Sequence, residues 1–112
     1  MSSEKNKVEV IDRIYKVIQS RKNATPTDSY VASLRTGGLK KIAEKIGEEA
    51  TEAIIAAVGG DRKQTMHESA DLIFMLMVLW SEMEITPNDI FEELSRREGV
   101  SGHEEKNKRT KT

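Results

Sequence analysis

The sequence predicts an all-α fold, a bundle of four to five helices. Apolar side chains recur at three- and four-residue spacings over long segments, which is the period of helices with one buried face. Glycine and proline interrupt this periodicity at intervals and divide the chain into helix-length segments. The most apolar run is dominated by Leu and Met and contains neither Gly nor Pro, so it also favours a helix over a strand.

Composition limits the classes of protein that the chain can be. Its 112 residues suffice for one domain, expected at residues 1–106, with a charged tail at 107–112. The net charge of −1 gives no overall field to attract nucleic acid or a membrane surface, and the absence of cysteine excludes disulfides, thiolate metal sites and cysteine nucleophiles. The longest apolar run has nine residues, against ~20 for a membrane span. The polar N-terminus has no signal-peptide core, so we expect a cytoplasmic protein.

The first helix is expected at roughly residues 5–21, where charged residues separate apolar ones at helical spacing. The polar stretch at 23–29 is typical of a loop, and Pro26 prevents continuation of the helix. Its apolar positions are Val8, Val10, Ile11, Ile14, Tyr15, Val17 and Ile18.

A short helical turn is expected at residues 30–34, with Asp28 or Ser29 as its cap, followed by a flexible break at 35–38. The second long helix then covers about 39–58, and Gly59 and Gly60 end it. At 100° per residue its apolar side chains form one broad arc, and the opposite flank is charged. The arc consists of Ile42, Ala43, Ile46, Ala50, Ala53, Ile54 and Ala57, and the flank of Lys41, Lys45, Glu48 and Glu52, with Glu49 between the two.

The third helix, about residues 62–84, carries the strongest indication of assembly. Asp61 and Gln64 resemble a capping box at its start. The run Leu72–Trp80 is apolar on every side, and a chain of this length has few neighbours with which to bury it. We therefore expect a homodimer or a dimer of dimers.

The fourth helix has the clearest start signal in the chain. Thr86 is a preferred N-cap residue, Pro87 occupies the first helical position, and Asp89 places an acid in the first turn. The helix runs to about Arg97, and Gly99 stops it.

Two acidic pairs lie on the second and third helices. Glu49 and Glu52 are three residues apart, as are Glu68 and Asp71, so each pair occupies one helix face. Helices that face each other would gather four carboxylates, which repel unless a cation holds them. Oxygen-only ligands suit Mg²⁺ or Mn²⁺.

Most carboxylates on helices are simply solvated, and Lys45 with Glu49 or Lys41 with Glu48 would make ordinary helix charge pairs. Two features count against that interpretation here. The first acidic pair borders an apolar arc, and the second directly precedes the most hydrophobic run of the chain. Acids in such places are usually held by a cation, a base or a partner.

At these residues the chain resembles a known family. Glu48-Glu49-x-x-Glu52 with Glu68-x-x-Asp71 is similar to the signature of the all-α, MazG-like nucleoside triphosphate pyrophosphohydrolases. The segments 28–34, 41–49 and 97–106 are similar to the phosphoribosyl-ATP pyrophosphatase branch of histidine biosynthesis. Together the matching stretches extend over most of the chain from residue 28 to residue 106.

The resemblance implies Mg²⁺-dependent hydrolysis of phosphoribosyl-ATP between its α and β phosphates. The expected metal ligands are Glu49, Glu52, Glu68 and Asp71, with Glu48 orienting water or binding a second ion. The side chains expected to contact the substrate are cationic or come from the segments that mark the branch. They are Tyr30, Arg35, Lys40, Lys41, Lys45, Arg97 and Ser101, and the Gly37–Gly38 backbone is a further candidate for binding an anion.

The departures from the family pattern lie outside the acidic positions. Met75 stands where a histidine is expected, and His103 where an aliphatic residue is commoner. We interpret His67 and His103 as structural or surface residues. The cyclohydrolase domain that some relatives carry fused to this one has no counterpart here, so we expect the stand-alone form.

Other functions remain open from the sequence. A general nucleotide pyrophosphohydrolase acting on dCTP-like or noncanonical triphosphates would share the acidic motif, but the segments around Tyr30 and Ser101 argue against it. A non-enzymatic module that dimerises through residues 72–80 would leave the acids unexplained. A ferritin-like di-iron bundle requires Glu-x-x-His pairs, and here the second positions are carboxylates.

Overall fold

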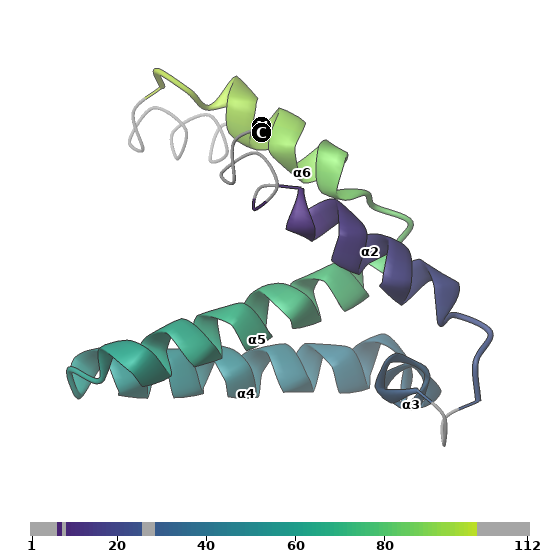
Figure 1. The fold of residues 1–112 in the computed structure, drawn as a ribbon, viewed down its shortest axis with the longest axis horizontal. Coiled ribbons are helices and arrows are strands. Elements are labelled where there is room, and N and C mark those ends of the chain that lie inside the picture. Colours follow the sequence, from purple (N-terminus) through teal and green to yellow (C-terminus); the bar gives the residue numbers. More distant parts are fainter. Residues whose placement is uncertain (1–6, 8, 26–28, 101–112) are drawn as a thin grey trace.

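The structure is a computed structural model that describes residues 7, 9–25 and 29–100. Five helices are labelled in this part of the chain (Figure 1), and it contains no strand, so the all-α prediction is confirmed. None of these helices is long and apolar enough to cross a membrane. The predicted tail at 107–112 lies outside the described residues. The helices are α2 (Val10–Ser20), α3 (Tyr30–Thr36), α4 (Gly38–Val58), α5 (Arg62–Glu82) and α6 (Pro87–Arg96).

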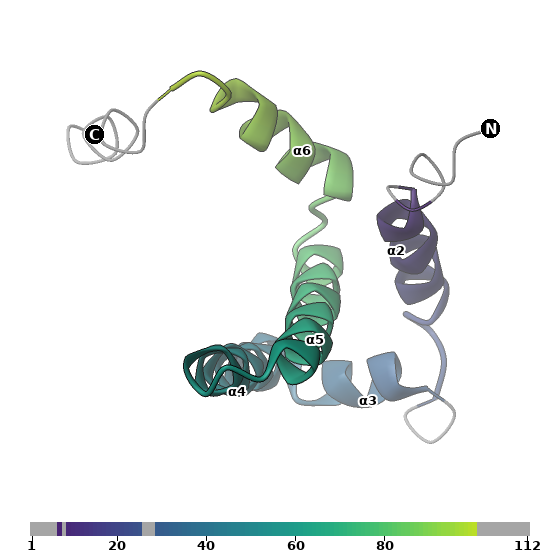
Figure 2. The ribbon, with the colours of Figure 1, turned by 60° about the vertical axis from the view of Figure 1, so that its left-hand side comes forward.

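The two longest helices, α4 and α5, form an antiparallel hairpin and lie side by side in both ribbon views (Figures 1 and 2). Gly60 makes the turn between them with φ at +75°, a left-handed conformation that glycine adopts without a steric cost. Asp61 caps α5 by accepting a hydrogen bond from the Gln64 backbone at 2.9 Å. The predicted capping box is only half formed, because the Gln64 side chain donates to Glu68 instead.

The short helix α3 is longer than its sequence suggested. Ser29 is the cap, accepting from the Ala32 backbone at 3.3 Å. Arg35 and Thr36 were expected in a flexible break, but they belong to α3. The interruption is confined to the Gly37–Gly38 junction, where Gly38 has φ at +73°.

The core lies where α2 and α3 pack against the α4–α5 hairpin. Met75 is only 2% exposed within it, so the residue found in place of the family's histidine fills apolar space. At the far end of α5 the Tyr15 hydroxyl donates to the Ile85 carbonyl at 2.6 Å. The buried core residues are Tyr15, Ile18, Val31, Leu34, Ile42, Met75, Met77 and Val78.

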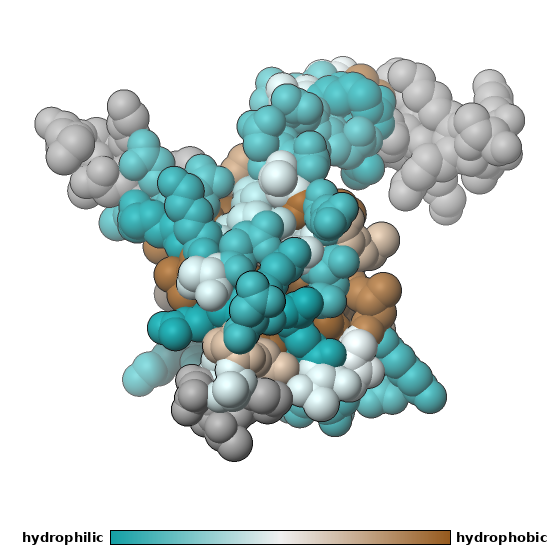
Figure 3. Space-filling view, turned by 90° about the vertical axis from the view of Figure 1, so that its right-hand side faces the viewer, coloured by the Kyte–Doolittle hydropathy of each residue, from teal (hydrophilic) through white to brown (hydrophobic). Residues whose placement is uncertain are grey.

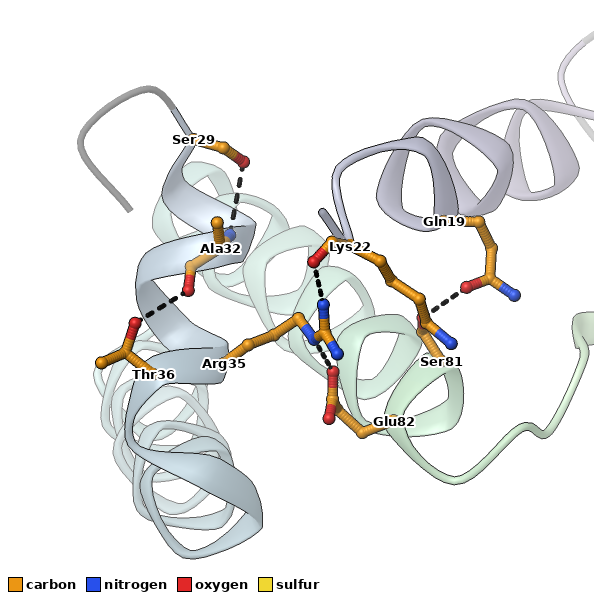
Figure 4. A network of polar contacts seen from close by, with 8 residues as sticks. All are labelled: Gln19, Lys22, Ser29, Ala32, Arg35, Thr36, Ser81 and Glu82. Atoms are coloured by element: carbon orange, nitrogen blue, oxygen red, sulfur yellow. Dashed lines mark hydrogen bonds and ion pairs between the residues drawn. The ribbon is translucent and has the colours of Figure 1, made fainter. Parts of the chain in front are cut away.

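A polar network fastens the C-terminal end of α5 (Figure 4). The Arg35 guanidinium donates to the Glu82 carboxylate and to the Lys22 carbonyl. The Ser81 hydroxyl, 2% exposed, donates to the Gln19 side-chain carbonyl at 2.8 Å. These contacts join α2, α3 and α5 at one end of the hairpin and leave its middle to the acidic residues.

Candidate metal centre and active site

The hairpin turn brings the two acidic pairs to the same level. Counted from Gly60, Glu52 and Glu68 are each eight residues away, and Glu49 and Asp71 are each eleven residues away. Because both helices rise by about 1.5 Å per residue, equal counts place these residues at equal heights on neighbouring helices. The three-residue spacing then turns each pair toward one side of its helix.

Three of the four predicted ligands share one cluster. Glu49, Glu52 and Glu68 each offer a carboxylate oxygen, and these oxygens lie within 4.8 Å of one another. Asp71 belongs instead to an adjoining cluster with Glu68 and His67. The ligand atoms of this second cluster also lie within 4.8 Å of one another. Glu68 is common to both clusters and is the most buried of these acids, at 7% exposure.

Two oxygens in the cluster are buried without a hydrogen-bond donor. They are Glu49 Oε2 and Glu68 Oε2, and no donor from the described residues reaches either one. An uncompensated buried carboxylate is costly, so the usual solutions are a proton, a base or a cation. An all-oxygen donor set with two orphaned oxygens fits a hard divalent cation such as Mg²⁺.

The electrostatics of the metal-free cluster support this interpretation. Burial, followed by the neighbouring Glu68, Glu52 and Asp71, raises the pKa of Glu49 to about 7. The pKa of Glu52 is also raised, chiefly by Glu68, whereas that of Glu68 is lowered because Glu52, Glu49 and the Gln64 amide all favour its charged form. The shifts therefore favour the protonated form of the α4 carboxyl groups and the charged form of Glu68.

Gln64 and His67 also lie at this site, although their positions in the sequence predict no role for them there. The Gln64 amide donates to Glu68 Oε1 at 2.6 Å, and His67 Nε2 lies 3.4 Å from Asp71 Oδ2. Each of the two residues lies four positions before a predicted metal ligand on α5. That i, i+4 spacing is the sequence feature from which these contacts could have been predicted. The sequence predicts only a helix cap for Gln64 and a structural or surface role for His67.

An open pocket of about 520 Å³ adjoins the cluster at the turn between α4 and α5. Glu52 and Glu68 line its acidic wall, and Ile55 and Ala56 line its apolar side. A space of this size next to a cation site suits part of a nucleotide. The remaining lining residues are Gly59, Asp61 and Gln64.

Of the predicted cationic side chains, Lys45 lies nearest the cluster within this chain. It is one helical turn before Glu49, and its Nζ is 3.4 Å from Glu48 Oε2. Lys41 is exposed and precedes Glu49 by eight residues, which is about 12 Å along α4 at ~1.5 Å per residue. Arg35 is occupied at the far end of α5 by Glu82.

The other branch-specific residues occupy two regions. The Tyr30 ring stacks on Phe74, one turn after Asp71, with centroids 6.4 Å apart and an interplanar angle of 20°. Arg97 Nε lies 3.2 Å from Glu93 Oε1 at the end of α6. Ser101 lies outside the described residues.

Comparison with known proteins agrees with this geometry. The family described as phosphoribosyl-ATP pyrophosphohydrolase matches residues 11–98, a range that includes both acidic pairs. This chain belongs to that family. A phosphoribosyl-ATP pyrophosphatase of Azospirillum brasilense is 48% identical over 109 residues, covering 97% of this chain and 98% of the relative.

Two further members of the family are similar over nearly their full length. The phosphoribosyl-ATP pyrophosphatase of Geobacter sulfurreducens is 49% identical over 98 residues, covering 88% of this chain and 91% of the relative. The phosphoribosyl-ATP pyrophosphatase of Novosphingobium aromaticivorans is 49% identical over 102 residues, covering 91% of this chain and 95% of the relative. The similarity therefore extends well beyond the acidic motif.

Proposed function

We propose that the chain hydrolyses phosphoribosyl-ATP with one water molecule to phosphoribosyl-AMP and pyrophosphate, the second step of histidine biosynthesis. The structural observation that carries the proposal is the carboxylate cluster with its two buried, orphaned oxygens, placed beside an open pocket. The names of the relatives supply the substrate. We place the reaction in the cytoplasm, where ATP-derived intermediates are made.

The proposed cofactor is Mg²⁺, held by Glu49, Glu52, Glu68 and Asp71. When bound, it would neutralise phosphate charge and orient the reacting groups, as phosphoryl transfer requires. Gln64 fixes the orientation of the Glu68 carboxylate through its 2.6 Å hydrogen bond and leaves Oε2 for the cation. This placement of a hydrogen bond behind a ligand is common in metal sites.

The remaining polar residues of α4 are assigned to the water and the phosphates. Glu48, on the exposed flank beside Lys45, is proposed to orient the attacking water or to bind a second ion. Lys45 is placed to meet phosphate oxygens one turn from Glu49. Lys40, Lys41, Arg35 and the Gly37–Gly38 backbone are proposed contacts for more distant parts of the substrate.

The second ribose phosphate distinguishes this substrate from a plain triphosphate. We assign its recognition to Tyr30, Arg97 and Ser101, which belong to the segments that mark the branch. Arg97 offers a forked, permanently charged donor. The alternative role of Arg97 is structural: it contacts Glu93 and complements the C-terminal end of α6.

A homodimer or a dimer of dimers is proposed as the assembly. Ile54 and Val58 share one face of α4 and are 63% and 84% exposed, and Ile73 is 43% exposed on α5. Apolar residues thus reach the surface among hydrophilic ones, as Figure 3 shows for one side of the molecule. The apolar run 72–80 is only partly buried within one chain, as a missing partner would leave it.

The assembly is tested by light scattering at micromolar concentration. Ile54→Lys introduces a charge on the exposed apolar face of α4, and Glu44→Lys is its control on an exposed polar position. The proposal expects the wild type and the control to be dimers or larger, with the Ile54 variant shifted toward the monomer. A monodisperse wild-type monomer would refute it.

The activity is tested by pyrophosphate release from phosphoribosyl-ATP, dCTP and ATP, each with and without Mg²⁺. The proposed function expects the highest kcat/KM for phosphoribosyl-ATP and no turnover after chelation. Equal or faster hydrolysis of dCTP would favour the alternative, a general nucleotide pyrophosphohydrolase. If none of the three substrates were hydrolysed, the result would favour the other alternative, a non-enzymatic module.

A further inference from the structure

His67 stands beside the acidic centre and adds a nitrogen ligand atom to it. Its Nε2 is 3.4 Å from Asp71 Oδ2, and the ligand atoms of His67, Glu68 and Asp71 lie within 4.8 Å of one another. The spacing of four residues between His67 and Asp71 is the one by which a single helix presents two ligands to one metal ion. The side chain of His67 is 65% exposed, so its ring is accessible from solvent.

A second observation is the buried Glu68 carboxylate at the centre of this group. It is 7% exposed, and its Oε2 meets no donor among the described residues. The Gln64 amide satisfies Oε1, so the carboxylate is already oriented, and Oε2, the oxygen proposed for Mg²⁺, is the one that a second ion would share. Glu68, the residue that both clusters share, therefore carries a buried oxygen that a cation would stabilise.

We propose that His67, Glu68 and Asp71 form a second cation position that takes a divalent transition-metal ion of the Zn²⁺ class. An imidazole nitrogen suits Zn²⁺ and its neighbours in the series, whereas Mg²⁺ takes oxygen ligands. The adjoining cluster of Glu49, Glu52 and Glu68 has oxygen atoms only, so the two positions differ in donor chemistry. Glu68 and Asp71 would serve both ions.

There is open space on the His67 side for the ligands that this group does not supply. A pocket of about 360 Å³ is lined by Asp61, Lys63, Gln64 and His67. Three protein ligands leave at least one position of a tetrahedral ion for water or a phosphate oxygen. Lys63, which lines this pocket, would attract an anionic ligand to that position.

This inference rests on the proposed function only in sharing Glu68 and Asp71 with the Mg²⁺ centre. The experiment therefore follows the two metals separately. Zn²⁺ and Mg²⁺ are titrated calorimetrically into the metal-free full-length protein, and the imidazole ¹⁵N resonances are recorded with each metal. The chain has two histidines, so His67→Gln assigns both signals and His103→Gln is the matched control.

The expected result is that Zn²⁺ shifts the His67 ring resonances and leaves those of His103 in place. His67→Gln should weaken Zn²⁺ binding by about ten-fold or more and change Mg²⁺ binding by less than about two-fold. His103→Gln should change neither. Circular dichroism confirms that the variants keep the helical content of the wild type.

Equal Zn²⁺ affinity in wild type and His67→Gln would overturn the proposal, as would equal shifts of both rings, the sign of adventitious binding to histidine. Failure of the proposed Mg²⁺ centre would appear differently. In that case Mg²⁺ would not bind the wild type at all, whatever Zn²⁺ does at His67.

Discussion

The carboxylate cluster predicts that Mg²⁺ binding depends steeply on pH. Burial and the neighbouring acids raise the pKa of Glu49 to about 7. A cation needs the charged carboxylate, so below pH 7 it must displace a proton. For one proton at this pKa the apparent affinity at pH 5.5 is about thirty-fold below its high-pH limit, and at pH 8 it is about 10% below it.

The raised pKa of Glu49 also determines whether the protein becomes more or less stable as pH rises when no metal is bound. A carboxyl group whose pKa is raised in the folded state keeps a proton that the unfolded chain releases above pH 4.5. The contribution of Glu49 to stability therefore falls as pH rises from about 4.5 through 7. The contribution of Glu52 to stability also falls as pH rises, because the pKa of Glu52 is raised. The contribution of Glu68 increases with pH, because the pKa of Glu68 is lowered. Added Mg²⁺ should restore stability most at high pH.

The assay is a calorimetric titration with Mg²⁺ at pH 6 in two buffers of different ionisation enthalpy. The difference in heat should correspond to release of about one proton per bound ion. Glu49→Gln should abolish the release, while Glu48→Gln, changed on the exposed flank beside Lys45, should retain it. An affinity that is flat between pH 5.5 and 8, with no proton released by the wild type, would refute the reasoning.

Three further predictions concern single side chains. Arg35→Ala leaves Glu82 without its cation in a half-buried setting and should lower the free energy of unfolding by ~1–3 kcal/mol; an unchanged urea midpoint would contradict this. Tyr15→Phe removes the hydrogen bond to Ile85 and should cost ~1 kcal/mol in the same measurement, while a more stable variant would show that the bond contributes nothing. Arg97→Ala should reduce kcat/KM for phosphoribosyl-ATP far more than for ATP, and equal losses on both would place the second phosphate elsewhere.

Local signals explain why the helix boundaries were predictable. The Gly59–Gly60 stop, the Asp61 cap and the Thr86–Pro87 start act within a few residues, so they can be recognised in the sequence. The extent of α3 was less predictable, since a helix of seven residues has little intrinsic stability. Its last turn is held by Arg35, whose partner Glu82 is 47 residues away.

The candidate site was predictable to the extent that it follows from one tight turn. Equal distances from Gly60 bring Glu52 to Glu68, and a sequence with two acidic pairs and a glycine turn contains that information. The division of ligands between two clusters depends on side-chain orientations that spacing does not determine. Tertiary packing also directs Arg35 to Glu82 and away from Glu49, whereas the distance from Lys41 to Glu49 follows from their separation along α4.

The central claim is that the acidic centre of α4 and α5 performs Mg²⁺-dependent hydrolysis of phosphoribosyl-ATP. Its most direct test is pyrophosphate release from phosphoribosyl-ATP by Glu52→Gln at saturating Mg²⁺, compared with wild type. This substitution removes one ligand charge and scarcely any volume. We predict that turnover falls by about three orders of magnitude with helical content unchanged. Turnover within about three-fold of wild type would contradict the claim.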